Sequence, residues 1–309
     1  MSNHETYDIA IIGTGFAGYT AGIYASRYKM KNVIFGDIFG GQTAEAHKVC
    51  NYPGIEEISG LELMNRVRKQ AKNLGTQEIM ERIDRVEWQP ATDIFKLISN
   101  SGTEYFAKYV LLTVGIKKRK LNAPGEERLA GKGISYCATC DGFFFKGKRI
   151  AIIGGGDAAT TAALYLSNIA EHVTMLVRGP KLKGETVWID QVLSMPNISV
   201  HFNTQVSEFV GETRLEKIKT TGEIEELTVE GAFIEIGSEP NREFLAQFGA
   251  EQDETGHLIV DKRQSTTIPK LFAAGDVTTN SNKFEQLVTA AGEASVAVNS
   301  IFEDLQLSK

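Results

Sequence analysis

The chain has 309 residues, 42% hydrophobic and 23% charged, which is ordinary for one large or two medium globular domains with a sizeable core. Its net charge of −6 gives no electrostatic reason to expect nucleic acid or an anionic membrane as a partner. No apolar run approaches the roughly 20 residues of a membrane-spanning helix, and the first residues do not resemble a secretory signal.

The chain opens with a pattern typical of a dinucleotide-binding fold. Ile9 to Ile12 form an apolar run, as in a strand buried on both faces, and GTGFAG then fits G-x-G-x-x-G before an amphipathic helix. Gly13 permits a tight turn, Gly15 lets the backbone approach a pyrophosphate, and Gly18 lets the helix pack on the strand. The helix N-terminus would face the phosphates with unpaired N–H groups. The surrounding strands and helix make this motif a strong signal.

The acidic residue that would bind the ribose is less well defined. In such folds it lies about 20 residues beyond the glycines, at the end of the second strand. Asp37 lies at about this distance, but it follows Gly36 and not the strand itself. Asp37 is therefore the candidate ribose ligand of the first fold.

Two of the three cysteines, Cys137 and Cys140, form a C-x-x-C in SYCATCDGFFF. Three cysteines are too few for a disulfide scaffold, so we expect a cytoplasmic protein, in which such a pair is more often catalytic or metal-binding than structural. Two thiols at this spacing can close a short disulfide loop and pass electrons on by thiolate exchange. The adjacent carboxylate of Asp141 can supply or remove the proton.

The dinucleotide pattern then begins a second time. Ile150 to Ile153 read as a strand, GGGDAA fits G-x-G-x-x-A, a helix follows to about Asn168, and His172 to Val177 read as the next strand. The candidate residues for a second nucleotide are Gly154, Gly156, Asp157 and Ala158. The second strand ends in Arg178, with Lys183 close behind. These two cationic side chains can pair with a 2′-phosphate and therefore favour NADP over NAD. They could equally be surface cations in contact with solvent.

A third landmark is TTIPKLFAAGDVTT, where a strand from Lys270 to Ala274 leads into Gly275 and Asp276. A carboxylate at this place can accept hydrogen bonds from the ribityl hydroxyls of a flavin. The following segment, NKFEQLVTAAGEASVAVNSIFEDL, predicts an amphipathic helix whose N-terminus could point at a flavin ring.

These elements predict an α/β protein of two Rossmann-like dinucleotide-binding domains, the second inserted into the first. The expected FAD-binding domain comprises residues 1–117 and 248–309, and the NADPH-type domain with the C-x-x-C comprises residues 118–247. The connectors, Val114 to Glu127 and Ile236 to Leu245, carry the Gly, Pro and charged residues of linkers.

The sequence resembles the low-molecular-weight thioredoxin reductases over essentially its whole length. The segments that carry this resemblance are GTGFAGYTAGIYASR, GGQTAEAHKVCNYPG, LLTVG, CATCDG directly before the second glycine motif, and FAAGDV followed by EQLVTAAGEA. The resemblance implies that electrons pass from NADPH through FAD and a Cys137–Cys140 disulfide to thioredoxin, in a homodimer. It implies that Cys140 lies against the flavin, that Cys137 attacks the partner disulfide, and that Asp141 is the general acid.

The same resemblance implies the FAD contacts, position by position. These are Gly13, Gly15, Phe16, Ala17, Gly41, Gln42, Asn51, Thr113, Gly115, Asp276, Val277, Glu285, Gln286 and Leu287.

The sequence departs from this family at the second nucleotide site. Thr161 and Ala162 stand where two glutamates are usual, and Val177-Arg178-Gly179 stands where His-Arg-Arg is usual. An arginine replaced by glycine loses its bidentate phosphate contact. The donor therefore stays open between NADPH and a non-NADPH donor such as ferredoxin.

Two further alternatives stay open. Cys50 replaces a usual glutamate, and we expect a small buried residue there, although a second redox group near the flavin is the other interpretation. His47, Cys50 and the C-x-x-C could instead make a Cys₃His zinc site, but this would leave both dinucleotide motifs unexplained, so we predict no metal. A related flavoenzyme could also run in the opposite direction and oxidise thiols with oxygen.

Overall fold

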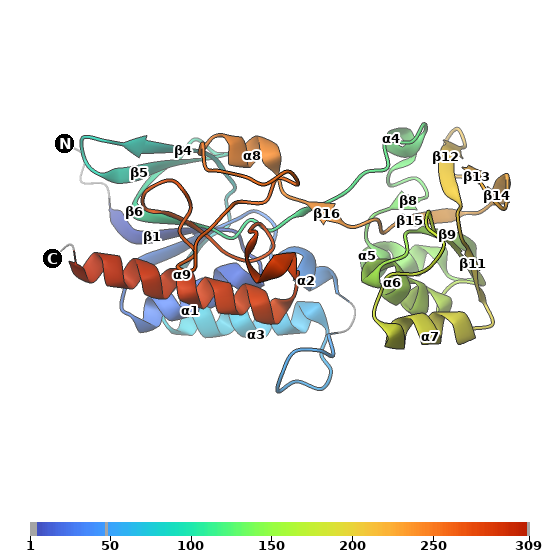
Figure 1. Ribbon diagram of the computed structural model, residues 1–309, viewed down its shortest axis with the longest axis horizontal. Helices are drawn as coiled ribbons and strands as arrows, with labels where there is room; N and C mark the ends of the chain where they lie inside the picture. The colour runs from blue at the N-terminus through green and yellow to red at the C-terminus, as the bar shows by residue number, and fades with distance from the viewer. Residues whose placement is uncertain (1–4, 47–48, 308–309) are drawn as a thin grey trace. The chain divides into compact units, whose positions relative to one another are not determined.

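The computed structural model describes residues 5–46 and 49–307, and the chain divides into two compact units (Figure 1). The first comprises Met1–Lys117 and Glu239–Lys309, and the second comprises Lys118–Ser238. The second unit ends at Ser238, whereas the sequence predicted that it would end at residue 247. Helix α8 (Arg242–Ala246) belongs to the first unit because its fully buried Leu245 packs in the core of that unit. No helix in the described ranges is both long and apolar enough to cross a membrane.

The first unit is built on a sheet of order β3-β2-β1-β6-β5-β4, with β17 beside the end of β6. Strands β1, β2, β3, β6 and β17 run parallel, whereas β4 and β5 form an antiparallel extension of β6. The strands are β1 Thr6–Ile12, β2 Asn32–Phe35, β3 Gln77–Ile79, β4 Ile83–Gln89, β5 Ile94–Ser99, β6 Glu104–Leu112 and β17 Leu271–Ala273.

Helices cover one face of this sheet, and α1, α3 and α9 lie side by side there (Figure 1). Ile9 and Ile11 of β1 point into this helical layer, while Ala10 and Ile12 join the core on the opposite face with Phe95 and Leu97. Both faces of β1 are thus buried, which explains its continuous apolar run. The helices are α1 Phe16–Arg27, α2 Gly41–Glu45, α3 Gly60–Asn73 and α9 Leu287–Leu307, with a 3-10 turn η2 at Asn280–Lys283.

The second unit repeats the plan with a parallel sheet of order β11-β10-β9-β15-β8. Helices α6 and α7 pack against each other and on one face, and the antiparallel meander β12-β13-β14 contributes to the core of the other face. The strands are β8 Ile134–Ser135, β9 Arg149–Ile153, β10 His172–Leu176, β11 Ile198–His201, β12 Gln205–Val210, β13 Lys217–Thr221, β14 Glu226–Thr228 and β15 Gly231–Ile234.

The helices of this unit are α4 Glu126–Leu129, α5 Ala138–Asp141, α6 Asp157–Ser167 and α7 Thr186–Ser194, with a 3-10 turn η1 at Gly142–Phe145. The two connecting segments pair as the short strands β7 (Lys117–Lys118) and β16 (Ser238–Glu239). Two Rossmann-like domains of α/β class are therefore confirmed, and each begins with a glycine-rich turn between its first strand and first helix.

Candidate functional site

The glycine turn between β1 and α1 forms a cradle at the N-terminus of α1. Gly13 has a φ of 130°, and a Cβ there would lie 2.2 Å from the Thr113 carbonyl oxygen. A Cβ on Gly18 would lie 1.9 Å from the Gly13 carbonyl oxygen, so the helix packs on the turn only through glycine. Gly15, by contrast, faces open space, and as N-cap of α1 it offers no side-chain hydrogen bond to the first-turn N–H groups. The turn is thus shaped to receive an anion.

The segment after β2 closes on the same turn. The Thr14 hydroxyl donates to the Ile38 carbonyl at 2.6 Å, and a Cβ on Gly41 would lie 3.6 Å from the Gly15 Cα. Gly41 has a φ of 51° and opens α2, next to Gln42, whose Nε2 donates to the Ile116 carbonyl at 2.8 Å. The N-termini of α1 and α2 therefore lie together beside the loop after β6.

The C-terminal part of the chain returns to this cradle. Gly275 has a φ of 80°, and a Cβ on it would lie 3.2 Å from the Cβ of Ala17. Asn51 Nδ2 donates to Gln286 Oε1 at 2.9 Å, which joins the loop after α2 to the residue that precedes α9. Asp276 follows Gly275 directly in the chain, so its backbone lies close to the first turn of α1.

Asp276 is an expected flavin contact whose carboxyl group has a perturbed pKa. Burial, followed by the negative charges of Glu285 and Glu293, raises this pKa from 3.8 to about 6. A carboxylate in such surroundings gains from donors that satisfy its oxygens, and ligand hydroxyls are donors of this kind.

The remaining expected FAD contacts differ in their exposure to solvent. Phe16, Ala17, Thr113 and Val277 are buried. Gly115 has a φ of 58° and faces open space, Leu287 opens α9, and Glu285 is exposed. Asp37 is exposed as well and lies 3.8 Å from Arg82 in an ion pair, so its contact with a ribose stays a prediction.

The residues present fit a flavin dinucleotide. The open space at Gly15 lets the backbone approach a pyrophosphate, and the N–H groups of the uncapped α1 N-terminus can donate to it. The partly buried carboxylate of Asp276 can accept hydrogen bonds from sugar hydroxyls.

Glu293 of α9 is a residue of this site that the sequence pattern did not single out. Its buried carboxylate accepts hydrogen bonds from the Gly275 N–H at 2.8 Å and from the Thr278 hydroxyl at 3.0 Å. The signal that would have found it is an acidic residue amid the small apolar residues of TAAGEASVAV, because a charge on a buried helix face needs partners.

In the second unit, Cys137 is disulfide-bonded and partly exposed. Its N–H donates to the Ser135 hydroxyl at 3.0 Å, and its carbonyl accepts from the Asp141 N–H at 3.2 Å, which holds the turn of α5. The side chain of Cys140 lies outside the part of the structure that is described, so its pairing with Cys137 stays a prediction.

Helix α5 is anchored on α6, the first helix of the second glycine fold. Ala138 is buried in that core, and a Cβ on Gly142 would lie 2.6 Å from Leu166 Cδ2. The next two side chains point outward, since Phe143 and Phe144 are 73% and 70% exposed. Two large apolar side chains thus flank the cysteine turn on the protein surface.

The second glycine turn, between β9 and α6, has the same arrangement of crowded and open glycines as the first. Gly154 has a φ of 143°, and a Cβ on it would lie 2.0 Å from the Glu235 carbonyl oxygen, while Gly156 faces open space. Asp157 Oδ1 accepts from the Glu185 N–H at 2.5 Å and so holds the loop after β10. The side chains of the other expected nucleotide ligands are exposed: Ala158, Arg178 and Lys183.

The structure bears on the expectations for Cys50 and for the alternative zinc site. The expected burial of Cys50 is wrong, because its free thiol is exposed in the loop that precedes Asn51. Among the described residues, no group of three His, Cys, Asp or Glu side chains could hold a metal ion. His47, the fourth ligand of the zinc alternative, lies outside the described residues.

Comparisons with known proteins agree with this geometry. The family model described as pyridine nucleotide-disulphide oxidoreductase matches residues 7–294. The thioredoxin reductase of Bacillus subtilis is 36% identical over 320 residues, which cover 99% of this chain and 98% of that protein. The crystal structure of Lactococcus lactis thioredoxin reductase has a TM-score of 0.92 at 33% identity, with 97% of this chain and 99% of that chain covered. The T. acidophilum thioredoxin reductase structure has a TM-score of 0.91 at 35% identity, with the same coverage.

Proposed function

The chain belongs to the pyridine nucleotide-disulphide oxidoreductase family and, within it, to the thioredoxin reductases, and on this premise we propose that it reduces the disulfide of thioredoxin or of a similar small dithiol protein. The observation that carries the proposal is the disulfide-bonded, partly exposed Cys137 beside the exposed Phe143 and Phe144. A redox-active cysteine needs access to its partner, and exposed aromatic side chains are typical anchors of protein interfaces.

The proposed exchange proceeds through the two cysteines. The Cys137–Cys140 disulfide would be opened by an electron pair from flavin held at the first glycine turn, once the donor has reduced that flavin. The Cys137 thiolate then attacks the acceptor disulfide and forms a mixed disulfide, and the Cys140 thiolate displaces the reduced acceptor as it restores the disulfide. Asp141 provides the proton for the departing thiolate. One disulfide is reduced to two thiols in each turnover, and the enzyme's own disulfide forms again.

For the electron donor we propose NADPH bound on the second glycine turn. The open Gly156, the uncapped start of α6 and the exposed cations Arg178 and Lys183 support this assignment, because they can meet a pyrophosphate and a 2′-phosphate. We propose that the enzyme works as a homodimer in the cytoplasm, where thiols are kept reduced.

The test is an anaerobic titration of the purified protein with NADPH, NADH and reduced ferredoxin in separate cuvettes, followed by flavin bleaching. Rapid bleaching by NADPH supports the proposal. Bleaching by ferredoxin alone would transfer the donor role to an iron–sulfur protein and leave the second glycine turn without its proposed ligand. Protein without flavin absorbance after supplementation with FAD would overturn the whole assignment.

A further inference from the structure

The segment between Gly275 and α9 carries two of the expected flavin contacts, Asp276 at its start and Gln286 at its end. Between them the backbone takes an unusual path. Ser281, Asn282 and Lys283 adopt φ values of 51°, 53° and 56° in succession. Residues with a Cβ rarely occupy this left-handed region, and three in a row do so only when surrounding contacts hold them there.

Glu293 provides the first set of these contacts. Its Oε2 accepts from the Gly275 N–H at 2.8 Å and from the Thr278 hydroxyl at 3.0 Å, and its Oε1 accepts from the Ser281 hydroxyl at 2.6 Å. The residue is only 6% exposed. One buried carboxylate on α9 thus ties down three points of the segment, and hydrogen bonds to a charged acceptor are the strong ones.

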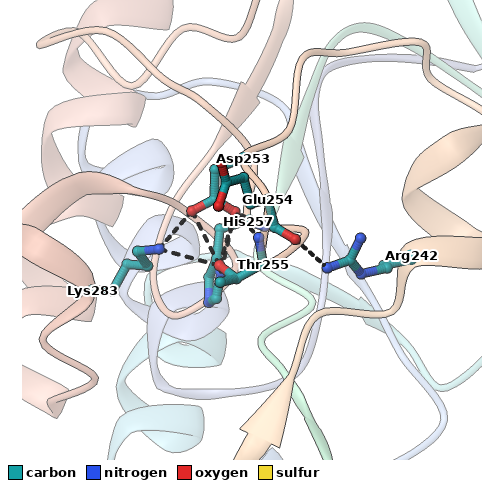
Figure 2. A network of polar contacts seen from close by, with 6 residues as sticks. All are labelled: Arg242, Asp253, Glu254, Thr255, His257 and Lys283. Carbon is teal, nitrogen blue, oxygen red and sulfur yellow. Dashed lines mark hydrogen bonds and ion pairs between the residues drawn. The ribbon is translucent and has the colours of Figure 1, made fainter.

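The far end of the segment is held by a second carboxylate. Figure 2 shows Lys283 reaching Asp253, and Nζ lies 2.5 Å from Oδ2 and 3.1 Å from the Thr255 hydroxyl. Burial alone would raise the pKa of Asp253, but the hydrogen bonds from Lys283, the His257 N–H and Thr255 outweigh it and hold this pKa below its usual range. Asp253 therefore keeps its charge, and Lys283 keeps its partner, across the neutral range.

We propose that Glu293 is a positioning residue of the flavin site, which orders the segment from Gly275 to Ser281 so that Asp276 is preorganised for the cofactor. The inference rests on the assignment of FAD to the first unit. Glu293 acts through the Gly275 N–H and two hydroxyl groups, so its effect on the cofactor is carried by the segment that it holds.

The test uses flavin-free protein and a titration with FAD, followed by the quenching of flavin fluorescence. Glu293→Ala removes all three acceptor contacts, and we expect it to raise the Kd for FAD about tenfold or more, because the segment must then be ordered when the cofactor binds. Glu293→Gln keeps an acceptor oxygen for Gly275 and Thr278 and offers its amide to the Ser281 oxygen. It should bind within about threefold of wild type.

Two further variants separate positioning from general damage. Ser300→Ala removes a buried hydroxyl of α9 that donates to the Val296 carbonyl of the same helix at 2.9 Å, and it should leave the Kd unchanged. Thr278→Val removes a single contact to Glu293 at nearly constant volume and should weaken FAD binding by a smaller factor than Glu293→Ala. This variant serves if Glu293→Ala fails to fold.

The outcomes are distinct. Equal FAD binding by wild type, Glu293→Ala and Thr278→Val would overturn the positioning role while leaving the flavin site in place. FAD binding by Glu293→Gln as weak as that by Glu293→Ala would also overturn it, because the hydrogen bonds that Gln can still form to the segment would then contribute nothing to cofactor binding. Absence of FAD binding by the wild-type protein would instead refute the proposed function.

Discussion

The side-chain amide of Asn51 donates a hydrogen bond to Oε1 of Gln286 at 2.9 Å, across 235 positions of sequence. The contact joins the loop after α2 to the start of α9 and aligns two residues that the family resemblance assigns to the flavin. Asn51 is exposed, so its contribution to the free energy of unfolding is small and can be measured separately from its contribution to FAD binding.

Asn51→Ala should weaken FAD binding about three- to tenfold, because Gln286 loses its partner and one flavin contact disappears. The free energy of unfolding of the flavin-free protein should change by less than about 0.5 kcal/mol, as is usual at exposed positions. Asn100→Ala, another exposed asparagine in the turn between β5 and β6, is the matched control. If Asn51→Ala lowered the free energy of unfolding but left the FAD affinity unaltered, the assignment of Asn51 as a flavin contact would be contradicted.

Two of the three glycines of the first motif, Gly15 and Gly18, should respond differently to alanine. A Cβ on Gly15 enters open space, so Gly15→Ala should fold with a loss of about 1 kcal/mol or less and bind FAD far more weakly. A Cβ on Gly18 would lie 1.9 Å from a backbone oxygen, so Gly18→Ala should lose about 2–3 kcal/mol or more of stability. Urea unfolding of the flavin-free variants checks both. Normal FAD affinity in Gly15→Ala would mean that no phosphate approaches this turn.

Asp276 should destabilise the flavin-free protein at neutral pH. Burial first, and then Glu285 and Glu293, raise its pKa from 3.8 to about 6. Folding therefore takes up a proton between these values, and the folded state loses stability as the pH rises through them. Asp276→Asn should raise the free energy of unfolding by on the order of 1–2 kcal/mol at pH 7 and by nearly nothing at pH 4.

The same substitution should weaken FAD binding at pH 7, because an amide is a poorer acceptor for ribityl hydroxyls than a carboxylate. Asp190→Asn, at an exposed position of α7, should leave both quantities unchanged. A variant less stable than wild type at pH 7 would show that Asp276 is satisfied within the protein alone.

At Glu78 the folding stability should depend on pH in the opposite direction to that at Asp276, because the pKa of Glu78 is lowered in the folded protein. Burial alone would raise the pKa of its carboxyl group, but hydrogen bonds from Arg68, Tyr19 and Lys72 lower it from 4.5 to about 2. The side chain is only 4% exposed. The stabilisation, on the order of 2–3 kcal/mol, is fully present above about pH 4.5 and is lost as the pH falls towards 2.

Glu78→Gln should therefore destabilise the protein at pH 7 and show a shallower loss of stability between pH 4.5 and pH 3 in urea unfolding. The exposed pair of Glu62 and Arg66 provides the control, since Glu62→Gln should change stability by less than about 0.5 kcal/mol. Equal effects of the two substitutions would show that the buried cluster contributes no more than a surface pair.

Local patterns were sufficient to predict the two Rossmann-like domains. The apolar run of Ile9 to Ile12 and the glycines after it predict a strand, a turn and a helix from short-range physics, and β1 and α1 follow that order. The second motif succeeds for the same reason, with α6 ending at Ser167 close to the expected Asn168.

The long-range parts of the site lay beyond such patterns. Nothing in residue periodicity brings Gly275 against Ala17 or Asn51 to Gln286. The family resemblance assigned Ala17, Asn51 and Gln286 to the flavin, but it did not predict these contacts between residues. Glu293 was missed because a helical pattern does not reveal which polar residue lies on the buried face. The burial of Cys50 was predicted from the usual behaviour of a lone cysteine, whereas its loop leaves the thiol exposed.

The most direct test of the central claim is an anaerobic dithionite titration of the FAD-loaded protein and of its Cys137→Ser variant, followed by flavin absorbance. A flavin coupled to a redox-active disulfide predicts that the wild-type chain takes up one electron pair for the flavin and a second for the disulfide, while the variant takes up only the first. Equal electron uptake by the two proteins would contradict a redox-active disulfide at Cys137, and with it the disulfide reductase mechanism.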